Sequence, residues 1–202
     1  MDTKHKVFIS YYHHDDQYYK DELLRQNKLY GLFEDYSVHE NEIDDTGKTS
    51  EQIRQIIRDD YIRDATVLIL LCGENTRKRK HIDWEIRAAM FDTELNPKMG
   101  ILIMNLPTIH QWVRAGENDD KALIADNITW VSTSTRTDFE EEYPYMPERI
   151  IDNFIKNVPI SVVEWSRVDN NPNILKSLIH NAFIRKYSND YDNTRLMRRS
   201  NS

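Results

Sequence analysis

Cysteine is almost absent from this chain, with Cys72 the single example among 202 residues. One thiol cannot form an internal disulfide, so the disulfide framework of small secreted domains is excluded. No run approaches the roughly 18 apolar residues of a membrane-spanning helix, and the first residues lack the apolar core of a secretory leader. We therefore expect a cytoplasmic protein that does not insert into a membrane.

Glycine and positive charge are also scarce. The chain has five glycines and contains neither a Walker A loop nor a G-x-G-x-x-G turn, and Ser10 lacks the G-x-S-x-G context of a hydrolase. Lys and Arg number 27 against 34 Asp and Glu, for a net charge of −7. Binding to nucleic-acid phosphates needs clustered cations, so we expect no nucleic-acid partner. The basic run 77–80 is interpreted as a solvated loop.

Short apolar segments alternate with amphipathic ones along the first half of the chain. Residues 6–11, 65–72 and 99–106 are predicted to be strands, and a weaker strand is predicted at 36–38. A helix is predicted from residue 82 to about 95, with an apolar stripe of Ile82, Ile86, Ala89 and Met90. This alternation predicts an α/β fold with a central parallel sheet of about five strands and helices on both faces.

Other local signals refine this outline. Asp15 and Asp16 are predicted to cap a helix, and Thr49 with Gln52 forms a capping-box pattern. Residues 128–131 are predicted to form the fifth strand.

The last third of the chain is predicted to be a helical extension. Pro147 suits the start of one helix, and Asn171-Pro172 opens another. Residues 160–163 are either a strand or a buried connector, and the polar residues after Ser188 are predicted to be disordered. We divide the chain into a domain core over 1–135, an extension over 136–188 packed on the same domain, and a disordered tail over 189–202.

Ligands of open parallel sheets bind beyond the carboxyl ends of the strands, where this chain places many polar residues. Glu85 lies about 80° from the centre of the apolar stripe of its helix, so its carboxylate is able to face a pocket. The competing interpretation is a first-turn glutamate that complements the helix dipole. The run His13-His14-Asp15-Asp16 suggests metal binding, but adjacent loop residues rarely supply several ligands to one ion, so no metal site is predicted.

These segments, in this order, resemble the Toll/interleukin receptor (TIR) domain family. Residues 7–11 match its first strand, F-I-S-Y, and 44–47 stand at its variable loop after the second strand. Trp84-Glu85-Ile86 resembles the start of the helix that follows the third strand. The similarity covers roughly residues 5–105 and is closest to the TIR-like proteins of bacterial Thoeris anti-phage defence.

The resemblance implies a flavodoxin-like fold and an enzyme that consumes NAD as a substrate, with no separate cofactor. The catalytic glutamate of the family maps to Glu85. His81 stands where many members have a tryptophan, and the loop at 44–47 lacks the common proline. The residues expected to contact NAD are Ser10, Tyr11, Tyr12, His13, Asp45, His81 and Trp84.

The chemistry of NAD is compatible with a single carboxylate. Nicotinamide leaves as a neutral ring from a cationic pyridinium, so no general acid is required, and a carboxylate stabilises the oxocarbenium-like transition state. Water attack yields ADP-ribose, whereas attack by the adenosine half of the same molecule yields a cyclic ADP-ribose. The resemblance further implies self-association on activation, a phage-derived trigger, and an effector protein that responds to the nucleotide product.

Three alternative functions compete with this interpretation. A TIR-type scaffold that only binds proteins would keep the fold without using Glu85, and a nucleoside-type glycosyl transferase would use a similar glutamate on free nucleosides. A phosphoacceptor receiver domain needs an aspartate at the end of the third strand, where this chain reads Leu71-Cys72-Gly73, and it is rejected.

Overall fold

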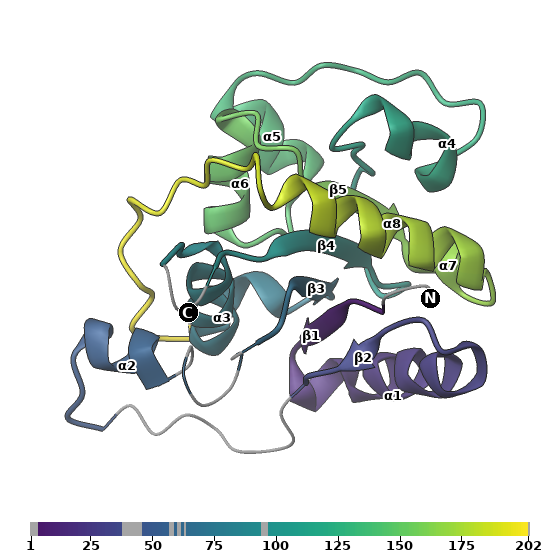
Figure 1. Cartoon of the computed structure of the whole chain (residues 1–202). Coiled ribbons are helices and arrows are strands. Elements are labelled where there is room, and N and C mark those ends of the chain that lie inside the picture. The colour runs from purple at the N-terminus through teal and green to yellow at the C-terminus, as the bar shows by residue number, and fades with distance from the viewer. Residues whose placement is uncertain are drawn as a thin grey trace.

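A computed structural model describes residues 4–37, 46–56, 59, 62, 64–93 and 97–201 of the chain. Its described residues form a five-stranded sheet with the order β2-β1-β3-β4-β5, in which all neighbouring strands are parallel (Figure 1). The predicted α/β fold is therefore confirmed. The strands are β1 (Lys6–Ser10), β2 (Glu34–Asp35), β3 (Val67–Cys72), β4 (Gly100–Asn105) and β5 (Ser161–Glu164).

The strand order has a switch point between β1 and β3. From β1 the chain first moves outward to the edge strand β2, and then crosses back to add β3, β4 and β5 on the other side of β1. All six residues of β3 and of β4 are buried, as expected of parallel strands covered on both faces. In open α/β sheets the crevice at such a switch point, beyond the carboxyl ends of the strands, is the preferred ligand site.

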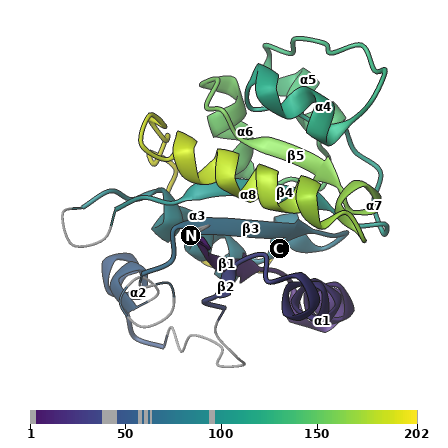
Figure 2. The ribbon, with the colours of Figure 1, turned by 45° about the vertical axis from the view of Figure 1, so that its right-hand side comes forward.

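Helices cover both faces of the sheet. One face carries α1 (His13–Tyr30), α4 (Lys121–Ile124), α7 (Trp165–Val168) and α8 (Pro172–Arg185). The other carries α3 (Lys80–Met90), α5 (Arg136–Glu142) and α6 (Glu148–Ile155), with α2 (Ser50–Ile56) beside α3. Figure 2 shows α8 crossing in front of β4, with α3 behind the strands. Within the described residues, no helix is long and apolar enough to cross a membrane.

Helix ends agree with the sequence in some places and differ in others. The predicted capping box is present, because Thr49 and Gln52 each accept a hydrogen bond from the backbone N–H of the other. The predicted cap of α1 is wrong. The N-cap is Tyr12, so Asp15 and Asp16 lie inside the first turn, where they complement the helix dipole.

Two strand predictions are corrected. The second strand is Glu34–Asp35, two residues before the predicted 36–38. Residues 128–131 form no strand, and the fifth strand is Ser161–Glu164, which pairs with β4. Burial gives the reason: Val162 and Val163 are fully buried, whereas Ile128 is 43% and Val131 61% exposed. The ambiguous segment at 160–163 is thereby resolved as part of a strand.

The helix that carries Glu85 starts earlier than predicted. It begins at Lys80 and ends at Met90, and its predicted apolar stripe is buried as expected. Residues 94–96, where the predicted helix was to end, lie outside the described residues. Because Glu85 is the sixth residue of α3, it lies in the second turn and not in the first, where the dipole interpretation placed it.

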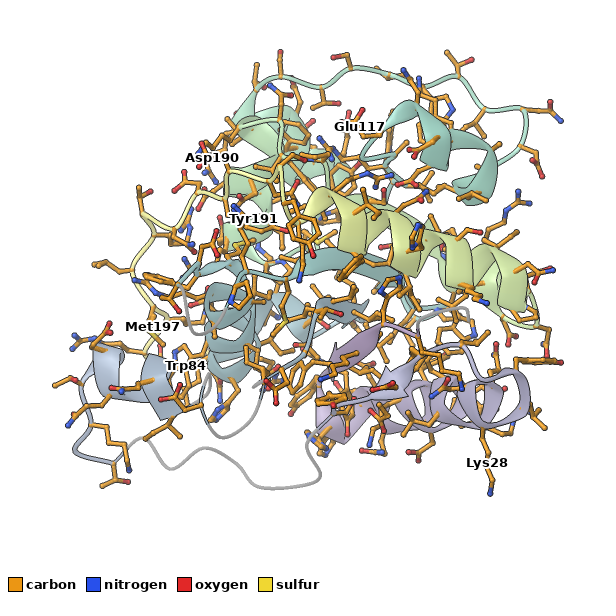
Figure 3. All side chains as sticks on the ribbon, viewed as in Figure 1. Lys28, Trp84, Glu117, Asp190, Tyr191 and Met197 are labelled. Carbon is orange, nitrogen blue, oxygen red and sulfur yellow. The ribbon has the colours of Figure 1, made fainter. Side chains whose placement is uncertain are left out.

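The segment after Ser188 differs from the disorder that its composition predicts. Tyr191 and Met197, both labelled in Figure 3, are 8% and 7% exposed and belong to the core cluster on the α3 side of the sheet. The Tyr191 hydroxyl donates to the carbonyl of Met99 at 2.9 Å. The sequence does not reveal this attachment, because two apolar side chains six residues apart form no periodic pattern. The other contacts of the segment are hydrogen bonds to residues distant in the sequence, which composition cannot indicate.

Candidate active site

The end of β1 points a hydroxyl at the predicted catalytic carboxylate. Alternate residues of a strand face opposite sides of a sheet, and Phe8 packs on the α3 side whereas Val7 and Ile9 pack on the α1 side. Ser10 follows this alternation to the α3 side, where it is 1% exposed and donates from Oγ to Glu85 Oε2 at 2.6 Å. The structure thus brings together two predicted site residues that lie 75 positions apart.

The surroundings of Glu85 change its acidity. The side chain keeps partial exposure to solvent, but the protein atoms packed around the carboxyl remove most of its hydration. This burial raises the pKa of Glu85 to about 7, and the hydrogen bond from Ser10 opposes the rise. A carboxyl with a pKa near neutrality, at the edge of a sheet, is a candidate for catalysis.

The aromatic candidates divide between the two faces. Tyr11 is buried on the α1 side, where its hydroxyl donates to Gln17 at 2.7 Å and lies 2.9 Å from His13 Nδ1. Tyr12 packs on the α3 side with the guanidinium carbon of Arg79 3.7 Å from its ring centroid. The structure therefore places Tyr12 on the same face as Ser10 and Glu85, and places Tyr11 and His13 on the other.

Trp84 is held within the core. Its side chain is 2% exposed, and its indole N–H donates to the carbonyl of Arg198 at 2.7 Å. The ring of His81 meets it edge to face at a centroid distance of 4.9 Å. The structure thus gives Trp84 a packing role and leaves His81 beside it. Asp45, the remaining predicted contact to NAD, lies outside the described residues.

The sequence did not single out Asp16 as a buried acid. Its side chain is 1% exposed, and Oδ2 has no hydrogen-bond partner in the part of the chain that is described. Burial, reinforced by the charge of Asp15, raises the pKa of Asp16 to about 6. Gly73 makes this position possible, because a Cβ there would lie 2.5 Å from Asp16 Oδ1. A glycine directly after a central strand is the sequence signal that another group packs closely against the backbone at that position.

A buried ion pair lies next to the candidate catalytic residue. Asp83 accepts hydrogen bonds from Arg149 Nε at 3.0 Å and from Arg149 Nη2 at 3.1 Å. Arg149 is completely buried, and its partner is 7% exposed. The pair joins α6 to α3 two residues before Glu85. No local pattern in the sequence indicates a contact between residues so far apart.

A separate cavity of about 550 Å³ lies near the ends of β4 and β5. Its lining includes Trp112, Trp130, Glu142 and Glu164, and none of the predicted site residues. Elsewhere, no group of three or more His, Cys, Asp or Glu side chains among the described residues is arranged to hold a metal ion. The Ser10–Glu85 pair is located at the topological switch point between β1 and β3.

Comparison with known protein families gives a match over the first half of the chain. The family model described as Thoeris protein ThsB, TIR-like domain, matches residues 8–111, which is more than half of the chain. The matched range runs from β1 through β4 and includes Ser10 and Glu85. Comparison with curated proteins finds no match. The chain belongs to the family of TIR-like domains of the Thoeris anti-phage defence protein ThsB.

Proposed function

We propose that this protein is an enzyme that breaks the bond between nicotinamide and ribose in NAD, with Glu85 as the catalytic residue. The observation that carries the proposal is the contact between Ser10 and Glu85 at the switch point of the sheet, where the pKa of the carboxyl is about 7. Membership of the TIR-like family supports the same assignment. Tyr12, His81 and Asp45 remain proposed contacts to the substrate, and Ser10 is proposed to act through Glu85.

Glu85 acts in its ionised form. As the C1′–N bond breaks, the bonding electron pair moves to the nicotinamide nitrogen and positive charge develops on the ribose. The carboxylate stabilises that charge and accepts hydrogen bonds from ribose hydroxyls. Ser10 donates to one carboxylate oxygen and so fixes the direction in which the other oxygen points. The proposed reaction needs no second acid because the leaving group departs without a proton.

The second half of the reaction sets the product. An oxygen or nitrogen of the adenosine half attacks C1′ and loses its proton, which closes a cyclic ADP-ribose, whereas attack by water gives linear ADP-ribose. We propose the cyclic product, which would act as a signal to a partner effector of the Thoeris system. Self-association after a phage-derived trigger would complete the site, and the loop around residue 45 is the segment proposed to take part.

The test is the identity of the products formed from NAD. Concentrated wild-type protein, with and without extract of phage-infected cells, is incubated with NAD, nicotinamide riboside or adenosine. We expect nicotinamide and one product with the mass of a cyclic ADP-ribose from NAD, and neither from Glu85→Gln. Cleavage of adenosine would favour the nucleoside-type enzyme. Binding to other proteins with no nicotinamide release under any of these conditions would favour the scaffold.

A further inference from the structure

The segment after Ser188 runs antiparallel along the helix that carries Glu85 (Figures 1 and 3). We call residues 190–201 the C-terminal strap. It contacts α3 at successive turns. The hydrogen bonds run from Asn193 Nδ2 to the Met90 carbonyl at 3.0 Å, from Arg87 Nη1 to the Arg195 carbonyl at 2.6 Å, from Trp84 Nε1 to the Arg198 carbonyl at 2.7 Å, and from the Lys80 N–H to Asn201 Oδ1 at 2.9 Å.

The strap is also tied to the buried ion pair. The backbone N–H of Arg198 donates to Asp83 Oδ2 at 2.9 Å, so this carboxylate receives both Arg149 and the strap. Arg149 in turn donates to the carbonyls of Arg195 at 3.0 Å and Leu196 at 3.4 Å. Three elements, α3, α6 and the strap, therefore meet at the residue two positions before Glu85.

These contacts fix the rotation of α3 about its own axis. Asp83 and Trp84 are held from the strap side, while Glu85 meets Ser10 on the sheet side. Consider an atom that lies about 6 Å from the helix axis. A rotation of about 20° would move this atom by about 2 Å, which is enough to break a hydrogen bond. The contact between Ser10 and Glu85 therefore depends on how the strap side of α3 is anchored.

We propose that the C-terminal strap is a positioning element for catalysis, which holds α3 at the rotation that keeps Glu85 against Ser10. The inference rests on the proposed function for its catalytic meaning. The strap lies outside residues 8–111, the range that matches the family model.

The sharpest test removes one backbone donor. Arg198→Pro eliminates the N–H that binds Asp83, and Arg198→Ala is the matched control because it shortens the side chain and keeps that N–H. We expect kcat of Arg198→Pro to fall by about 10- to 100-fold with an unchanged KM for NAD, since misplacement of a catalytic group by about 1 Å costs up to this factor. Arg198→Ala should stay near the wild type.

A second variant keeps the test decisive if the proline variant does not fold. Trp84→Phe removes the indole N–H that binds the Arg198 carbonyl but keeps an aromatic ring in the core. We expect the same split between kcat and KM. If Arg198→Pro folds and has the kcat of the wild type, the proposal is wrong. If Arg198→Pro does not fold, a wild-type kcat in Trp84→Phe would overturn the proposal. Equal losses in Arg198→Pro and Arg198→Ala would also overturn it, because they would assign the effect to the guanidinium.

A readout without turnover separates this inference from the proposed function. The carboxyl pKa of Glu85 is measured by NMR on glutamate-labelled full-length protein, with Glu85→Gln used to assign the signal. Loosening the strap should admit water, so the pKa should drop from about 7 toward the ordinary value of 4.5 in Arg198→Pro and Trp84→Phe. If the wild type cleaves no NAD but the two variants show this drop in the pKa of Glu85, the proposed function alone is wrong. An unchanged pKa in both variants would sink the role of the strap.

Discussion

Two glutamates at the same edge of the sheet show how differently a partly buried carboxylate can be held. Glu164 ends β5 and receives Asn105 Nδ2 at 3.1 Å, while the same amide also donates to the carbonyl of Trp112. Gln111 closes this network by donating to Asn105 Oδ1. Each of the two carboxylates therefore receives one hydrogen bond among the described residues, Glu164 from an amide that belongs to a network and Glu85 from the hydroxyl of Ser10.

Burial raises the pKa of both carboxyls, to about 7 at Glu85, and at Glu164 the hydrogen bond from Asn105 opposes the rise. Amide networks such as the one around Glu164 satisfy a carboxylate and fix a loop, which is a structural use. A carboxylate that burial has stripped of its hydration is stabilised by a nearby positive charge, which a cationic transition state supplies. The comparison favours Glu85, whose pKa burial raises to about 7, as the glutamate proposed for catalysis.

The largest expected effect is the loss of turnover in Glu85→Gln. The substitution keeps the volume and removes the charge that stabilises the ribose cation, so the rate of nicotinamide release should fall on the order of 100- to 1000-fold. Glu164→Gln is the matched control, and its rate should remain within a few-fold of the wild type. The reverse pattern would move the chemistry to the cavity bounded by Trp112, Trp130 and Glu164.

Part of this picture was available from the sequence. The apolar runs of β3 and β4 predict central strands, because burial on both faces selects continuous apolar residues. The stripe of α3 places Glu85 at the border of the core. The alternation of a strand also predicts that Ser10 and Tyr12 share one face and that Tyr11 takes the other. By this rule Ser10 and Tyr12 belong to one set of candidate contacts to NAD, and Tyr11 does not.

Other features depend on contacts between distant residues. The segment 128–131 has as strong a local strand pattern as 161–164, and pairing with β4 decides between them. The strap is polar and has no period, so its attachment to Asp83 and Trp84 becomes visible only when α3 and α6 are assembled. The local sequence pattern predicts which segments can form strands or helices. Where two segments have equally strong patterns, contacts with other parts of the fold decide which one forms the strand.

A smaller effect concerns stability and sharpens the contrast between the two glutamates. The pKa of Glu85 is about 7 in the folded protein and near 4.5 in an unfolded chain, so the unfolded state loses its proton first as the pH rises. As the pH rises from about 4.5 to 7, the wild type should therefore lose stability relative to Glu85→Gln, whose side chain at position 85 does not titrate. We expect Glu85→Gln to be more stable above pH 7 by on the order of 1–3 kcal/mol, with the two proteins similar at pH 4.

Urea denaturation at pH 4 and pH 8 measures this difference, and Glu164→Gln provides the comparison. Residues shaped for catalysis often reduce stability, and their replacement then stabilises the fold. An equal gain in Glu164→Gln would remove the distinction between the two carboxylates. A Glu85→Gln protein that is less stable than the wild type at pH 8 would mean that the charge of Glu85 holds the fold together.

The smallest expected effect tests the hydrogen bond from Ser10 to Glu85. The Ser10 hydroxyl donates to the carboxylate and lowers the pKa of Glu85, so Ser10→Ala should raise that pKa above about 7. Because the ionised form is the proposed active form, kcat/KM for NAD should increase with pH, and its rising limb should move to higher pH in the variant. At pH 7 the rate should fall several-fold, and at pH 9 it should recover most of the wild-type value. Ser10→Thr keeps a hydroxyl and should leave the limb in place. A loss of the same size at every pH would show that Ser10 acts on the substrate or on packing, and not through the ionisation of Glu85.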